Sequence, residues 1–200
     1  MSLLQILTII GTITFAITGA LKARTHRMDV FGGAVLAFVT AYGGGTIRDL
    51  LLGKQPVNWV NDFLALYFVV GSAVFVFLFK MNHVFFKRLI YITDAVGLGV
   101  FTIAGIQVAF SLGATPIYAV IMGVITATFG GLLADILCSV QPSILRRGEL
   151  YATSCLIGGI CFVALKKYQL ANTAETVICV LLIIVIRIVA TRRQIKLPAI

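Results

Sequence analysis

Five charged residues lie well inside stretches of this chain that are otherwise apolar. Charged side chains are costly in hydrocarbon, so residues of this kind usually face the interior of a helix bundle and mark a functional pathway. The five are Arg48, Asp49, Asp94, Asp135 and Arg187. We expect Asp94 either to pair with Arg48 or to point into a pathway. Arg187 lies near the end of the last apolar stretch, where a long side chain can extend to the membrane surface.

Two of the aspartates each follow a cluster of glycines by four residues. The clusters are Gly43, Gly44 and Gly45 before Asp49, and Gly130 and Gly131 before Asp135. Glycine costs about 0.8–1 kcal/mol relative to alanine in a helix interior, so each cluster predicts a kink or a break. Backbone groups freed by a break cannot face lipid, so both breaks should line a pore or a cavity.

Carboxylates beside a narrow passage attract cations and deter anions, which is one interpretation of Asp49 and Asp135. The alternative is an internal salt bridge that holds the helices together, formed by Arg48 with Asp135 or Asp94. The two interpretations are compatible.

The elements that carry these residues are seven apolar stretches. The chain of 200 residues is 60% hydrophobic and 12% charged, with a mean hydropathy of +1.07, whereas soluble domains contain about 25% charged residues. The stretches are long enough to span a bilayer, the sixth only marginally, and their continuous apolar character favours helices over a barrel. They cover residues 3–21, 30–52, 63–79, 89–110, 115–138, 150–165 and 174–191. We therefore predict an all-α integral membrane protein with seven transmembrane helices.

The chain contains an internal duplication. A shift of 86 residues aligns Gly11 with Gly97, Gly19 with Gly105, Gly44-Gly45 with Gly130-Gly131, Asp49 with Asp135 and Pro56 with Pro142. Each repeat holds three spans, an odd number, so the second repeat enters the membrane from the opposite side. The prediction is an inverted pair of three-helix repeats, residues 1–82 and 87–168, followed by a seventh helix and a basic tail, residues 173–200. In such folds the functional site lies near the membrane midplane, between the repeats.

The other glycines, the two matched prolines and Trp59 have simpler interpretations. Close helix packing explains the glycines outside the two clusters. Pro56 and Pro142 should end the second and fifth helices, and Trp59 is expected to anchor the outer membrane surface. The packing glycines are Gly11, Gly19, Gly97, Gly105, Gly158 and Gly159.

Basic residues predict the orientation. With the N-terminus outside, the inner segments hold eleven Lys and Arg residues and the outer segments hold four. The positive-inside rule therefore places the C-terminus in the cytoplasm. The formal net charge of +9 orients the protein and contacts anionic lipid, and it gives no evidence for nucleic-acid binding.

Residue patterns typical of enzymes and cofactor sites are missing from the sequence. His26 and His83 have no partner at metal-ligand spacing, and the four cysteines have no C-x-x-C spacing, so we interpret the cysteines as buried apolar residues. No nucleophile, zinc or phosphate-loop motif occurs. We expect no enzyme activity, no cofactor and no metal beyond transient monovalent cations.

Two segments carry a family resemblance. FGGAVLAFVTAYGGGTIRDLLLGKQPVNW and ITATFGGLLADILCSVQPSIL resemble the prokaryotic relatives of the trimeric intracellular cation (TRIC) channels, a bacterial family also described as "glycine transporter". The resemblance covers essentially the whole chain. It implies a homotrimer with one pore per protomer, lined mainly by kinked second and fifth helices and permeable to potassium and other monovalent cations. The motif residues that carry over are Gly43, Gly44, Gly45, Arg48, Asp49, Gly130, Gly131 and Asp135.

The second repeat departs from the family pattern, because Ala134-Asp135 replaces an Arg-Asp pair. Any role that requires two symmetric arginines is thereby put in question. The leading hypothesis is a potassium- or sodium-conducting channel in the inner membrane of a prokaryote, in contact with membrane lipids. The rivals are a carrier for glycine or another small zwitterion, and a non-conducting scaffold.

Overall fold

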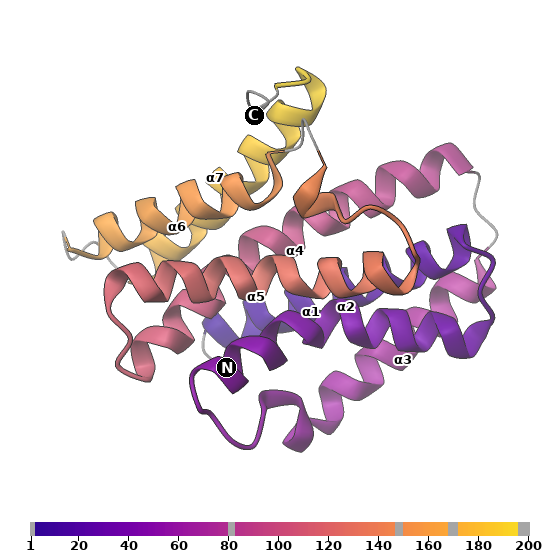
Figure 1. Cartoon of the computed structure of the whole chain (residues 1–200), viewed down its shortest axis with the longest axis horizontal. Helices are drawn as coiled ribbons and strands as arrows, with labels where there is room; N and C mark the ends of the chain where they lie inside the picture. Colours follow the sequence, from indigo (N-terminus) through magenta and orange to yellow (C-terminus); the bar gives the residue numbers. More distant parts are fainter. Residues whose placement is uncertain (1–2, 80–82, 147–149, 168–171, 196–200) are drawn as a thin grey trace.

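The structure of this chain, a computed structural model, describes residues 3–79, 83–146, 150–167 and 172–195. These residues form seven α-helices and two short 3-10 helices, and none of them is in a strand (Figure 1). The α-helices are α1 (Leu3–Thr25), α2 (Val30–Leu51), α3 (Phe63–Leu78), α4 (His83–Ser111), α5 (Pro116–Leu137), α6 (Tyr151–Lys167) and α7 (Asn172–Arg192); the 3-10 helices are η1 (Asn58–Asn61) and η2 (Ser143–Leu145). The predicted all-α architecture of seven helices is confirmed.

The helices match the apolar stretches because each stretch must satisfy its own backbone hydrogen bonds in lipid. Five of the helices, α1, α2, α4, α5 and α7, are long and apolar enough to cross a membrane. α3 and α6 are shorter apolar helices, with 16 and 17 residues. At 1.5 Å per residue they are about 25 Å long, close to the lower limit for a spanning helix.

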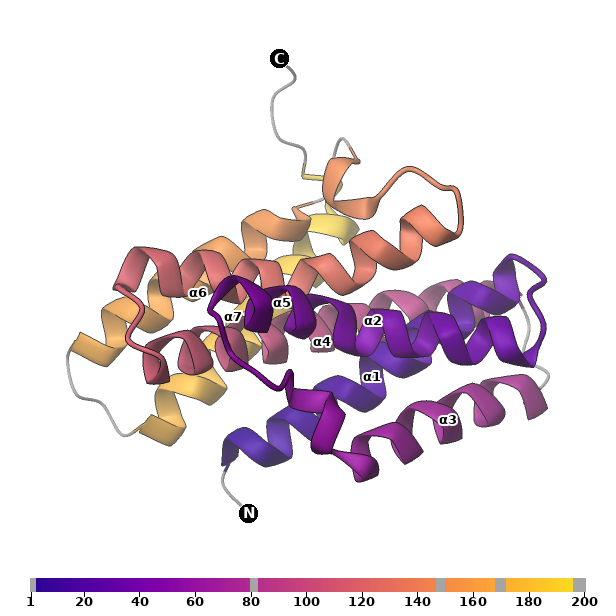
Figure 2. The ribbon, with the colours of Figure 1, turned by 60° about the horizontal axis from the view of Figure 1, so that its bottom comes forward.

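Four helices form the centre of the bundle. α1 packs on α2 and α4, and α5 packs on α2 and α4. α3 covers α1 and α2, whereas α6 and α7 pack together and cover α4 and α5. Figures 1 and 2 show α3 on one flank of the bundle and the α6–α7 pair on the opposite flank.

α2 and α5 cross where two glycines replace side chains. A Cβ at Gly44 would lie 2.1 Å from the carbonyl oxygen of Thr126, and a Cβ at Gly130 would lie 2.2 Å from the carbonyl oxygen of Thr40. Residue 44 therefore meets 126 and residue 40 meets 130, so the two helices run antiparallel at their crossing. Only glycine permits the backbones to approach so closely.

Of the kink or break predicted at these glycines, the break is wrong and the kink stays a prediction. α2 continues as one α-helix through Gly43–Gly45, and α5 continues through Gly130–Gly131. The weak helix propensity of glycine costs about 1 kcal/mol per residue, whereas an unpaired backbone group in a membrane costs several. The helices therefore stay hydrogen-bonded, and the glycines serve the contact between them.

The glycines outside the clusters also lie in close contacts. A Cβ at Gly19 would lie 2.5 Å from Thr40 Oγ1, and a Cβ at Gly105 would lie 2.5 Å from Thr126 Oγ1. Every residue in the second contact lies 86 positions after its counterpart in the first. Similar close contacts surround Gly11, Gly97, Gly158 and Gly159, so the predicted packing role of these glycines is confirmed.

Candidate functional site

Asp49 lies near the end of α2 and has partners on both carboxylate oxygens. Arg48 donates to Oδ1 from Nε at 2.9 Å and from Nη2 at 2.6 Å. The backbone N–H of Asn58 donates to Oδ2 at 3.0 Å. Both charged residues are buried, Asp49 completely. The carboxylate thus fixes the loop after α2 to the helix, and the predicted pairing of Arg48 with Asp135 or Asp94 is wrong.

Asp135 has the same arrangement near the end of α5, with a different cation. The backbone N–H of Ser143 donates to Oδ2 at 2.8 Å, and Lys22 Nζ lies 2.7 Å from Oδ1. Lys22 comes from the C-terminal part of α1. It supplies the positive charge that an arginine at position 134 would have placed here, where the buried residue is Ala134.

The two carboxylates lie on opposite sides of the α2–α5 crossing. Each aspartate follows the centre of the crossing by seven residues of its own helix, about 10 Å at the α-helical rise, and the helices run in opposite directions. Asp49 and Asp135 are therefore about 20 Å apart along the helix axes. Figure 1 shows the two helices side by side with their C-terminal ends pointing in opposite directions.

Asp94 belongs to a network that joins α4, α6 and α7. The Tyr151 hydroxyl donates to Asp94 Oδ1 at 3.1 Å, and Arg187 Nη2 lies 3.6 Å from Oδ2. The Arg187 guanidinium also lies over the Tyr151 ring, 4.8 Å from its centroid, and 5.5 Å from the centroid of Tyr91. Tyr91 in turn donates to the Arg187 carbonyl oxygen.

Arg187 is only 2% exposed, so the predicted extension of its side chain to the membrane surface is wrong. An unpaired guanidinium is expensive among apolar side chains, and a buried carboxylate with two aromatic rings lowers that cost. For the same reason Asp94 pairs with Arg187 and not, as predicted from the sequence, with Arg48.

A cavity of about 250 Å³ brings Asp94 and Asp135 together. Its charged and titratable lining residues come from α1, α4, α5, α7 and the segments after α1 and α5. They are Lys22, His26, Lys87, Asp94, Asp135, Cys138, Arg146 and Arg187, with Tyr91 beside them. The cavity is therefore polar and lies on the Asp135 side of the crossing, away from Asp49.

The clustered glycines differ in what they face. Gly43 faces Leu133 and Gly130 at the helix crossing. A Cβ at Gly45 would meet the Arg48 guanidinium at 3.8 Å, and a Cβ at Gly131 would meet the Tyr151 hydroxyl at 2.7 Å. Gly45 and Gly131 thus leave space for polar side chains, one on each side of the crossing.

Sequence reasoning missed Lys22, Tyr151 and the role of Arg187. Lys22 lies directly after the first apolar stretch and was counted only as an inner-surface charge. A buried tyrosine in an apolar helix resembles any other aromatic core residue. Trp59 donates from Nε1 to Thr46 Oγ1 at 3.0 Å and packs edge-on against Phe38, and its position at the membrane surface stays a prediction.

This chain matches one protein family and bacterial membrane proteins of known sequence. The family model described as "Glycine transporter" matches residues 5–80 and 91–167. The chain is 44% identical to the UPF0126 inner membrane protein YadS of Escherichia coli K12, over 96% of this chain and 93% of that protein. It is 38% identical to a UPF0126 membrane protein of Vibrio cholerae, over 98% of this chain and 82% of that protein.

Solved structures with the same fold are cation channels. The TRIC trimeric intracellular cation channel orthologue from Rhodobacter sphaeroides superposes with a TM-score of 0.91 at 38% identity, covering 98% of this chain and 100% of that chain. A prokaryotic TRIC channel determined in 0.5 M KCl gives 0.89 at 34% identity, covering 97% and 98%. These relatives are channels, which agrees with the expectation that the chain is not an enzyme.

Proposed function

Because this chain belongs to the glycine-transporter family and shares its fold with prokaryotic TRIC channels at 34–38% identity, we propose that it is a monovalent-cation channel permeable to potassium. One pore runs through each protomer, lined mainly by α2 and α5. The observation that carries the proposal is the pair of buried carboxylates, Asp49 and Asp135, on opposite sides of the α2–α5 crossing.

The pathway passes the polar groups beside Gly45 and Gly131 and reaches the cavity that Asp94 and Asp135 line. A carboxylate near the path favours cations, and the helix crossing sets the narrowest part. Gly43, Gly44 and Gly130 allow this crossing by keeping side chains out of it.

Each carboxylate already holds a tethered cation. Lys22 Nζ sits 2.7 Å from Asp135, where a permeating monovalent ion would bind, and Arg48 does the same at Asp49. Both side chains therefore restrict the path, and a permeating ion must compete with them. Lys22 is the weaker obstacle because an ammonium is a single point charge, whereas Arg48 binds its carboxylate through two nitrogens.

The architecture within the membrane is part of the proposal. Residues 1–82 and 87–168 are the two inverted repeats, and residues 173–200 are the seventh helix and its basic tail. Two separate matches of the family model and the contacts repeated at a spacing of 86 residues support the duplication. The excess of inner-segment Lys and Arg residues supports an outside N-terminus and a cytoplasmic C-terminus.

The relatives support the location and the assembly. YadS is named an inner membrane protein, and the R. sphaeroides relative is described as a trimeric channel. We place the chain in the inner membrane as a multi-pass homotrimer in contact with membrane lipids.

Planar-bilayer recording of the purified trimer tests the function. We expect discrete potassium currents, larger in Lys22→Met because the Asp135 carboxylate then loses its tethered competitor. Asp135→Asn should reduce the current and the preference for cations, because it leaves the Lys22 ammonium without its carboxylate. Lys87→Met is the matched control: this exposed lysine lines the same cavity, and its loss should change the current little. Folded trimers that carry no current at any voltage or ionic condition would refute the proposal.

A carrier for glycine or a similar zwitterion is the second candidate. Arg48 and Asp49 place a guanidinium and a carboxylate side by side, the two groups that bind the ends of a zwitterion. Saturable uptake of labelled glycine into proteoliposomes, without unitary currents, would favour this candidate over the channel.

A further inference from the structure

A groove of about 480 Å³ lies at one end of the bundle and shares no lining residue with the cavity beside Asp135. It is bounded by the C-terminal ends of α1 and α3 and the N-terminal end of α2. Its volume is within the range of about 300–1,000 Å³ typical of small-molecule sites. The floor is apolar and buried, formed by Ala20, Ala23, Ala73 and Val76. Phe77 and Leu78 form an exposed apolar edge.

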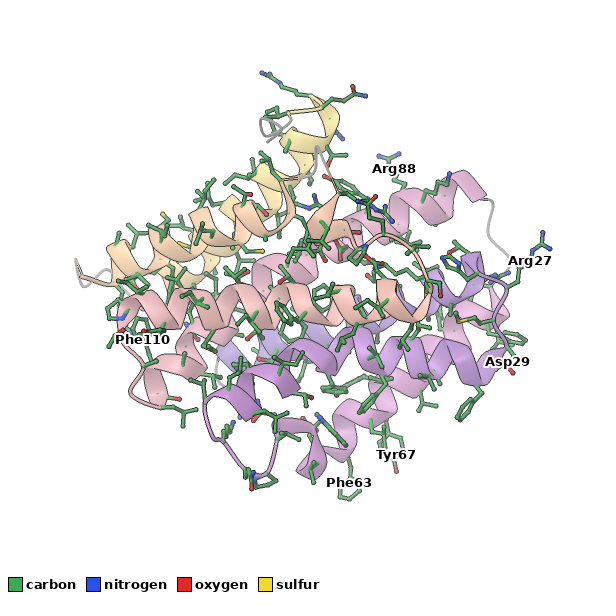
Figure 3. All side chains as sticks on the ribbon, viewed as in Figure 1. Arg27, Asp29, Phe63, Tyr67, Arg88 and Phe110 are labelled. Atoms are coloured by element: carbon green, nitrogen blue, oxygen red, sulfur yellow. The ribbon has the colours of Figure 1, made fainter. Side chains whose placement is uncertain are left out.

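The rim of this groove is basic. Arg24 donates from Nη1 to the carbonyl oxygens of Val76 and Phe79, so its guanidinium is held at the C-terminal end of α3. Arg27 follows α1 and is exposed, and Figure 3 shows its side chain extending from the end of the bundle. Asp29 also lines the groove, but its carboxylate caps α2 by accepting from the Gly32 N–H at 2.8 Å. The rim therefore carries two guanidinium groups and one carboxylate, and that carboxylate already has a backbone partner.

One position in the groove is open because the residue there has no side chain. Gly33 lines it, and a Cβ built there meets no atom within 4 Å. This contrasts with Gly19 and Gly44, where a Cβ would collide with a neighbouring helix. The α2 surface at Gly33 thus faces space that the protein itself does not fill.

An apolar floor with a basic rim at the end of membrane-spanning helices matches one type of ligand. We propose that the groove binds an anionic phospholipid, with an acyl chain along Ala73 and Phe77 and the phosphate at Arg27 and Arg24. A guanidinium binds phosphate oxygens through two parallel hydrogen bonds, and basic residues at the membrane surface favour anionic headgroups. The proposal is independent of ion conduction, so its test does not require an active channel.

Quenching of a tryptophan by brominated lipid tests this site directly. The chain has one tryptophan, Trp59, which is remote from the groove, so a Trp59→Phe, Phe77→Trp protein carries its only indole at the groove edge. In bilayers that contain brominated phosphatidylglycerol or brominated phosphatidylcholine, we expect phosphatidylglycerol to quench at a several-fold lower mole fraction.

Three substitutions in this reporter protein locate the ligand. Arg27→Gln should bring the two lipids to equal quenching, and Arg27→Lys should retain part of the preference. Arg88→Gln is the matched control, because Arg88 is an exposed arginine on α4 outside the groove (Figure 3), and it should leave the preference unchanged. Gly33→Leu should fill the open space and reduce quenching by both lipids.

In monodisperse reporter protein, each explanation other than the proposed site gives a different quenching result. Equal quenching by the two lipids in the unsubstituted reporter would overturn the headgroup preference. An equal effect of Arg88→Gln and Arg27→Gln would mean that the general membrane charge attracts the lipid, without a defined site. Absence of quenching by either lipid, or an unchanged signal in Gly33→Leu, would mean that no lipid occupies the groove.

Discussion

The α2–α5 crossing predicts that replacing different helix glycines by alanine changes the stability of the fold to different degrees. At Gly44 the added methyl group would lie 2.1 Å from a backbone carbonyl oxygen, about 1 Å inside normal contact. A helix backbone cannot rotate away as a side chain can, so α2 and α5 must separate. Overpacking of this kind typically costs about 1–3 kcal/mol, and the intrinsic preference of a helix for alanine returns at most about 1 kcal/mol.

Gly71→Ala is the matched control because Gly71 lies inside α3 and a Cβ there meets nothing within 4 Å. Here only the helix preference acts, and we expect a gain of about 0.5–1 kcal/mol. The helix preference is the same in all three variants and cancels, so Gly44→Ala and Gly130→Ala should be about 1–3 kcal/mol less stable than Gly71→Ala. Gly43→Ala should be intermediate, because its nearest contact at 2.9 Å is a terminal methyl group of Leu133, which can move.

Thermal unfolding of the detergent-solubilised trimer, followed by size-exclusion chromatography, ranks these variants. The expected order of stability is Gly71→Ala first, then Gly43→Ala, then Gly44→Ala and Gly130→Ala together. If Gly44→Ala unfolds at the same temperature as Gly71→Ala, the helices are not held in direct backbone contact. A large difference between Gly44→Ala and Gly130→Ala would contradict the reciprocal geometry of the crossing.

Two further predictions concern buried polar contacts. Arg187→Met should destabilise the fold by about 3–5 kcal/mol, because Asp94 loses a buried ionic partner; adding Asp94→Asn should restore part of that loss, measured by chemical unfolding. Trp59→Phe should lower the free energy of unfolding by about 0.5–1.5 kcal/mol, because the hydrogen bond to Thr46 is lost while the ring contact with Phe38 is kept. In the double variant, Thr46→Val should not add a second loss of equal size, because both changes remove the same hydrogen bond.

The sequence predicts the helices well because lipid leaves few alternatives for an apolar stretch. The boundaries are less predictable where polar residues continue a helix beyond the hydrocarbon. α4 begins at His83, six residues before the predicted apolar stretch, and its first turns contain Lys87 and Arg88. α1 likewise continues through Lys22 and Arg24 to Thr25. Hydropathy detects the apolar part of a helix and does not detect this polar extension.

The candidate site illustrates a different limit. The sequence identifies Asp49, Asp94 and Asp135 as ionisable residues in spans, and all three are buried. It does not identify their partners, because a partner depends on how neighbouring helices are rotated about their axes. The glycine clusters show the same limit, since their spacing marks an unusual contact but does not separate a helix break from a close crossing.

The two ends of the proposed path differ in how their ion pairs are held in place. Arg48 and Asp49 are adjacent on α2, so this ion pair moves with one helix. Lys22 and Asp135 belong to α1 and α5, so any shift of one helix against the other changes their 2.7 Å separation. A sub-ångström relative motion weakens such a contact, whereas the Arg48 pair survives it. We infer that the end of the proposed path at Lys22 opens more readily than the end at Arg48, because its ion pair spans two helices.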